Sequence, residues 1–160
     1  MKRYLYLLIF STICLSCTKN NINRKIIQMD DVIQQMKDNN IKNESLFKER
    51  TPSQINENEV RIVDSFLVDG VERFNMKQRE SERTINDLID IENYQCNYIP
   101  TLNEKGEKII HVIAKMADRD DIWWEVYEIM NVRDGYITVF WFSLNLSEKR
   151  GGNIWPNGEG

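Results

Sequence analysis

His111 is the only histidine in the sequence, so it is the side chain whose ordinary pKa lies closest to neutral pH. The strand pattern described below places it in a row across the sheet, Tyr98–His111–Glu128–Trp141. A carboxylate beside an imidazole raises the pKa of the ring and can make it a general base. The simpler interpretation is a polar cross-strand pair worth about 0.2–1 kcal/mol. We favour that interpretation, because no nucleophile or second acid lies near the row in the sequence.

The row depends on three predicted turns. Asp134-Gly135 is a two-residue hairpin signal, which pairs the strand-like run before it with the run after it. Loops of four residues at 118–121 and 103–106 extend the pairing to two earlier runs. A loop one residue longer would turn every side chain of a strand to the other face of the sheet.

The same pairing divides the aromatic residues between two faces. The more apolar face is predicted to lie under helices and contains Trp123, Tyr127, Ile129, Phe140, Phe142, Leu144 and Leu146. Trp124 and Trp141 fall on the other face. If that face is uncovered, the two tryptophans form a contact surface, and with the row they are the predicted ligand-binding residues.

Other chemistry has little support. The acidic turn 118–121 lacks the glycine and distal glutamate of a calcium-binding loop, and a single histidine with a single unmodified cysteine makes a zinc site improbable. No phosphate-binding loop, dinucleotide fingerprint or hydrolase elbow is present. The formal net charge of −4 excludes the basic stripe of a nucleic-acid-binding protein. We therefore expect no metal, cofactor or nucleic acid.

Helices are predicted to precede the sheet. Thr51-Pro52-Ser53-Gln54 has the pattern of a capping box with proline at the first helical position. A stripe with helical spacing follows, formed by Val60, Val63, Leu67, Val71 and Phe74. Gly70 weakens this helix by roughly 1 kcal/mol relative to alanine. With a second stretch at 81–92, the helical region covers about 52–92, as one long helix or a bent pair.

Beyond residue 93 the apolar spacing changes to alternation. Strand-like runs rich in β-branched and aromatic residues cover 94–98, 109–116, 122–132 and 136–146, and 153–156 adds a short final strand. Pro100 suits an edge strand. The predicted class is α+β, with N-terminal helices packed on one face of a four- to five-stranded antiparallel meander over about 93–156, in a domain at 51–160. This order resembles the cystatin-like and NTF2-like folds, in which a helix lies across a curved antiparallel sheet.

The first sixteen residues have the layout of a secretory signal. Met1-Lys2-Arg3 is basic, and residues 4–13 form an apolar run too short to span a bilayer, which needs about 20 residues. Leu15-Ser16-Cys17 follows and resembles the lipobox of bacterial lipoproteins, although Cys14 stands where an aliphatic residue is usual. The resemblance implies cleavage before Cys17 and lipidation of its thiol. The alternative is an ordinary secreted protein.

Several expectations follow from that processing. Removal of residues 1–16 takes away Lys2 and Arg3 and no acid, so the formal net charge falls from −4 to about −6. Cys96 is then the only unmodified cysteine, and no internal disulfide can form. Two interpretations of the polar segment 17–50 stay open. It is either a flexible tether, or it carries a short amphipathic helix over about 24–38.

The function expected is that of a non-catalytic lipoprotein of the cell envelope, anchored in the outer membrane facing the periplasm, that binds a protein or a small ligand. The stretch 98–108 and the closing Asn157-Gly158-Glu159-Gly160 resemble small uncharacterised lipoproteins of gut-type anaerobes, which implies no activity. Two alternatives are an immunity or inhibitor lipoprotein against a toxin or hydrolase, and an NTF2-like enzyme that uses His111 and Glu128.

The anchor can be tested directly. Replacement Cys17→Ser removes the thiol that would carry the lipid, so the chain should leave the membrane fraction or accumulate uncleaved, with its melting temperature unchanged. Fractionation and immunoblotting measure this, with Cys14→Leu, which places the usual aliphatic residue there, as the control that should stay anchored. A Cys17→Ser chain that is processed and remains in the membrane would contradict lipidation at this residue.

Overall fold

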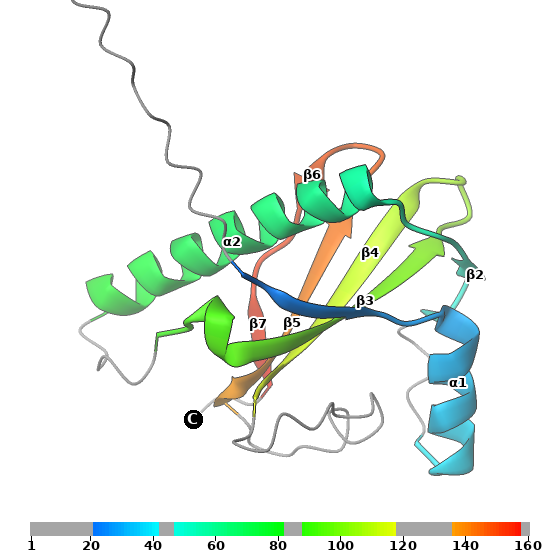
Figure 1. Cartoon of the computed structure of the whole chain (residues 1–160), viewed down its shortest axis with the longest axis horizontal. Coiled ribbons are helices and arrows are strands. Elements are labelled where there is room, and N and C mark those ends of the chain that lie inside the picture. Colours follow the sequence, from blue (N-terminus) through cyan, green and yellow to red (C-terminus); the bar gives the residue numbers. More distant parts are fainter. Residues whose placement is uncertain (1–20, 42–46, 82–87, 118–135, 158–160) are drawn as a thin grey trace, which may run out of the picture.

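The computed structural model describes residues 21–41, 47–81, 88–117 and 136–157, which form an α+β fold with a mixed, open sheet (Figure 1). In these ranges the elements are β1 (Asn23–Ile26), α1 (Met29–Asp38), β2 (Thr51–Pro52), α2 (Glu57–Glu80), a 3-10 turn (Ile91–Asn93), β3 (Tyr94–Leu102), β4 (Lys108–Met116), β5 (Tyr136–Asn145), β6 (Arg150–Gly151) and β7 (Trp155–Asn157). The predicted α+β class is confirmed.

The sheet is only partly the predicted meander. Its main path runs β1-β3-β4-β5-β6, with β2 beside β3 and β7 beside β5. The antiparallel meander is confirmed for β3, β4 and β5, but β1 pairs with β3 in parallel. The predicted run 122–132 lies outside the described residues. It was expected between 109–116 and 136–146, yet β4 and β5 pair directly from Ile109 to Lys115, so that strand order is wrong.

The N-cap of helix α2 lies five residues later than the predicted cap, at Asn56 instead of Thr51. The side chain of Asn56 accepts a hydrogen bond from the Glu59 N–H, and the Glu59 carboxylate accepts one from the Asn56 N–H. This reciprocal capping box satisfies two amide groups at the helix start, whereas Thr51 and Pro52 form β2 against β3. The helix ends at Glu80 and residues 88–90 are not helical, so the predicted span 52–92 was too long at both ends.

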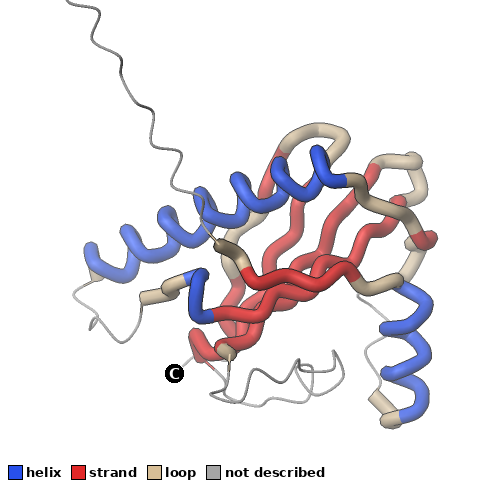
Figure 2. The backbone as a smooth tube through the Cα atoms, in the orientation of Figure 1, coloured by secondary structure: helices blue, strands red, loops and turns tan. Residues whose placement is uncertain are grey.

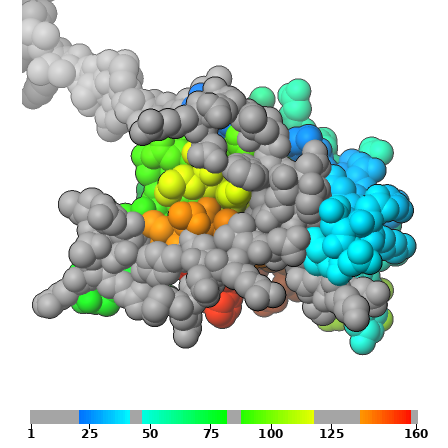
Figure 3. All heavy atoms as spheres, turned by 90° about the horizontal axis from the view of Figure 1, so that it is seen from below, coloured from blue at the N-terminus to red at the C-terminus, as the bar shows by residue number. Residues whose placement is uncertain are grey.

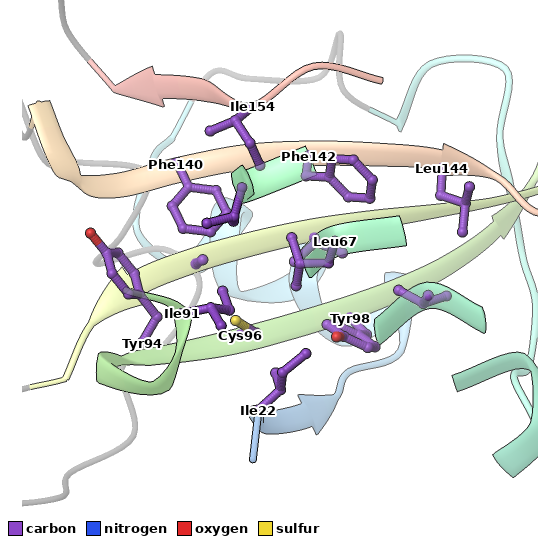
Figure 4. Close-up of a cluster of buried hydrophobic side chains, with 14 of the residues drawn as sticks. Ile22, Leu67, Ile91, Tyr94, Cys96, Tyr98, Phe140, Phe142, Leu144 and Ile154 are labelled. Carbon is purple, nitrogen blue, oxygen red and sulfur yellow. The ribbon is translucent and has the colours of Figure 1, made fainter. Parts of the chain in front are cut away.

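The apolar stripe of α2 packs on one face of the sheet, as predicted. Its buried members are Val60, Val63, Leu67 and Val71, and they meet Phe140, Phe142, Leu144 and Leu146 of the face expected to be covered (Figure 4). Gly70 lies at this contact. A Cβ atom there would stand 3.2 Å from Cε2 of Phe142, so glycine permits the close approach of the helix to a fully buried ring.

Helix α1 covers the opposite face, which corrects the prediction that the helices share one face. Its buried residues Met29, Val32 and Met36 pack with Ile99, Ile113 and Val139, which alternate with the residues under α2. Figure 2 shows the helices on different sides of the strands, and Figure 3, from below, shows α1 at one margin of the view in which parts of β4 and β5 are also visible.

The polar segment before α1 takes part in the sheet. Residues 23–26, which were predicted as the start of a helix or as a tether, pair with β3, and Ile22 is buried in the core under α2. The predicted helix is real only from Met29. A flexible tether therefore does not describe residues 22–38.

Pro100 lies in the interior of the sheet, not at its edge. β3 has β4 on one side and, on the other, β1 up to Tyr98 and β2 from Thr101. Tyr98 accepts from Ile27 on that second side, and the Pro100 carbonyl accepts from the Ser53 N–H there, so the nitrogen of Pro100 faces the same side. Proline is tolerated because β1 pairs only up to Tyr98 and β2 only from Thr101, so neither strand needs the missing N–H.

Candidate functional site

The predicted row across the sheet does not form, because the turn between β3 and β4 has five residues. Asn103 holds Glu107 in the turn: the Asn103 side chain accepts from the Glu107 N–H, and the Asn103 N–H donates to the Glu107 carbonyl. The pairing is therefore Leu102 with Lys108, and Tyr98 lies opposite Val112 instead of His111. The extra residue puts Tyr98 and His111 on opposite faces.

His111 has neighbours on both sides that exclude the predicted partner. Ile99 lies opposite it on β3 and Ser143 on β5, so Glu128 cannot be its cross-strand neighbour as predicted. His111 is 6% exposed, and its Nδ1 lies 3.2 Å from Oγ of Ser143. The Phe47 ring packs edge-on against it, with 5.9 Å between the two ring centres. Among the residues that the structure describes, Nε2 of His111 has no hydrogen-bond partner. Glu128 itself lies outside the described residues.

The electrostatics of His111 are the reverse of those expected for a general base. Burial lowers the pKa of the ring to about 4, and the positive charge of Arg50 lowers it further in the same direction. The ring is therefore neutral at pH 7. A carboxylate partner would have raised the pKa instead.

The predicted aromatic residues also separate. Trp141 lies on the face away from α2, as predicted, but it is partly buried against the cluster of α1. Trp124 lies outside the described residues. Tyr98 is buried under α2 with Cys96, whose thiol pKa is raised by burial, as suits the apolar strand residue it was predicted to be.

The large hollow among the described residues lies elsewhere, between β1 and α2. We call it the β1–α2 groove; it has a volume of about 960 Å³ and is open to solvent. From β1 and the residue just before it, every second side chain lines the groove: Ile22, Arg24 and Ile26. α2 contributes residues at helical spacing along one face: Glu57, Val60, Arg61, Asp64, Ser65, Val68 and Asp69.

A polar triad from three elements lies at this groove. Oδ1 of Asp64, on α2, accepts a hydrogen bond of 2.8 Å from the Tyr98 hydroxyl of β3. Oδ2 of Asp64 lies 3.0 Å from Nη1 of Arg24, on β1. Burial raises the pKa of Asp64, while the Tyr98 hydrogen bond and the Arg24 charge act to lower it. Burial also raises the pKa of Tyr98, so its hydroxyl stays protonated and donates.

Tyr98 is thus the one predicted site residue connected to the groove: it is buried behind the lining and bonds to Asp64, which lines it. Arg24 and Asp64 were not predicted as site residues. The alternation of Ile22, Arg24 and Ile26 is typical of a strand, but Ile22, Ile26 and Met29 also have helical spacing, and only a helix or a flexible tether was predicted there. Asp64 lies beside the apolar stripe of α2, where a charged residue is typical of the solvated side of a helix and gives no separate signal.

Searches against known proteins add no relative. No family model, curated protein or solved structure matches this chain. Within the described ranges, no three His, Cys, Asp or Glu side chains are grouped to hold a metal ion. None of the helices described is both long and apolar enough to cross a membrane.

The buried state of His111 gives a pH prediction. Its pKa is lower in the folded chain than in the unfolded one, so the neutral ring stabilises the fold above pH 6.5. That contribution, on the order of 3 kcal/mol, should be lost as the pH falls from 6.5 to about 4. NMR titration of the single histidine ring should give a midpoint near 4. A midpoint at or above 6.5 would show that the ring has an acidic partner or is exposed.

Proposed function

We propose that this chain is a lipoprotein of the bacterial cell envelope, anchored through Cys17 in the outer membrane, whose domain binds a protein or small ligand in the β1–α2 groove without catalysing a reaction. The observation that carries the binding role is the groove itself. At about 960 Å³ it is as large as the sites that hold drug-sized ligands, roughly 300–1,000 Å³, and it is open to solvent.

The lining of the groove suits recognition. Apolar surface comes from Ile22, Ile55, Val60 and Val68, and charges come from both β1 and α2. Binding sites commonly combine an apolar lining with a few polar groups that fix the orientation of the ligand.

The triad supports binding over proton transfer. Tyr98 holds its proton, and Asp64 is already engaged by a hydroxyl and a guanidinium. These contacts fix Arg24 at one wall of the groove before any ligand arrives. A preorganised guanidinium loses less side-chain entropy on binding than a mobile one.

The anchor and the fold fit the same proposal. A lipidated Cys17 would lie four residues before the first described residue, Asn21, and that residue already lines the groove. α2 lies across the sheet, as a helix does in the cystatin-like and NTF2-like folds that the sequence order resembles, whereas the parallel β1 is not part of that pattern. The register of His111 gives no support to an enzyme of the latter kind that uses His111 and Glu128.

A photo-crosslinker in the groove tests the binding role. Ser65 is exposed on α2 and lines the groove, so benzoylphenylalanine at position 65 of the full chain should capture the ligand in intact cells. Lys77 is exposed on the same helix and is not among the lining residues, so position 77 is the matched control. We expect an adduct at position 65, several times stronger than any at position 77, with the bound species identified by mass spectrometry. Equal labelling at the two positions, or none at either, would overturn the proposal.

A further inference from the structure

β1 has a free hydrogen-bonding edge in the part of the chain that is described. It lies at the end of the sheet path, with β3 as its partner. Ile27 donates to the Tyr98 carbonyl, and since backbone groups alternate along a strand, Asn23 and Lys25 also point to β3. The N–H and C=O groups of Arg24 and Ile26 therefore point outward, away from the sheet.

The outward edge and the groove belong to one surface. The side chains of Arg24 and Ile26 line the groove, and Ile26 is 44% exposed, so its apolar surface is accessible to a ligand. The Arg24 guanidinium also donates a hydrogen bond of 3.4 Å to the carbonyl of Ile22. That carbonyl is the next one along the edge that points outward, so it already has a donor. An extended chain laid along β1 would pair with Arg24 and Ile26 and place every second side chain in the groove.

The charges of β1 indicate what kind of chain fits. Lys25 is exposed and takes part in none of the ion pairs between described residues. An acidic residue opposite Lys25 on an added strand would form a favourable cross-strand pair. A second copy paired antiparallel with Arg24 opposite Ile26 would instead place Lys25 opposite Lys25, which is unfavourable.

We propose that the groove takes an extended segment of a partner protein, which adds to the sheet as a strand along β1. Its apolar side chains alternate into the β1–α2 groove, and an acidic residue lies opposite Lys25. This inference rests on the proposed function of the groove and names its ligand class. Strand addition of this kind draws its affinity from main-chain hydrogen bonds and its specificity from the pockets for alternate side chains.

The test removes one outward N–H from β1 in the full chain that carries benzoylphenylalanine at position 65. Ile26→Pro deletes that donor while leaving the bonds to β3, because the Ile26 amide points away from β3. Ile26→Val keeps the donor and most of the apolar surface. We expect Ile26→Pro to reduce the position-65 adduct at least tenfold and Ile26→Val to change it less than twofold.

Thermal unfolding would reveal whether Ile26→Pro fails to fold. For that case, two substitutions at Lys25 test the same proposal, one that reverses the charge and one that keeps it. Lys25→Glu places an acid opposite the expected acid and should reduce the adduct at least threefold, whereas Lys25→Arg should preserve it. Both variants change an exposed side chain, so each should melt as the parent chain does.

The outcomes separate the two proposals. If the parent chain forms no adduct at position 65, both proposals are overturned. An adduct that survives Ile26→Pro in a folded chain, or that Lys25→Glu leaves unchanged, would overturn strand addition and leave the groove as a binding site. An adduct with the mass of a second copy of this chain, or of a small molecule, would also overturn the partner segment.

Discussion

The carboxylate of Asp64 is the point at which three parts of the fold are joined. It accepts from Tyr98, in the interior strand β3, and pairs with Arg24, in the edge strand β1, while its own backbone belongs to α2. The side chain is 20% exposed, so the ion pair is screened less than a surface pair would be. Loss of one partner would leave a half-buried charge without compensation, and the wall of the groove formed by β1 would lose its polar contact with α2.

Much of the core could be predicted from local patterns. The helical stripe of α2 and the alternation of Phe140, Phe142 and Leu144 are each set by burial of one face, and both were predicted correctly. The start of α2 was placed wrongly because Thr51-Pro52 and Asn56-Glu57 are both good cap sequences, and pairing with β3 decides between them. Such a tertiary preference is not visible in a local pattern.

The candidate site could not be predicted, for two physical reasons. Register is sensitive to a single residue, and the side-chain bonds of Asn103 that keep Glu107 in the turn put Tyr98 and His111 on opposite faces instead of the same one. The groove depends on a parallel pairing between residues separated by about seventy positions, β1 with β3, which no turn signal announces. Only Tyr98, through its hydrogen bond to Asp64, links the predicted site to the observed one.

The most direct test of this account is residue-by-residue amide hydrogen exchange of the ligand-free chain along β1. The account predicts alternation, with the amides of Lys25 and Ile27 exchanging slowly because they donate to β3, and those of Arg24 and Ile26 exchanging rapidly at the open edge. Uniform fast exchange over 23–27 would show that β1 is not a strand of this sheet. Uniform protection would show that its outer edge is already paired.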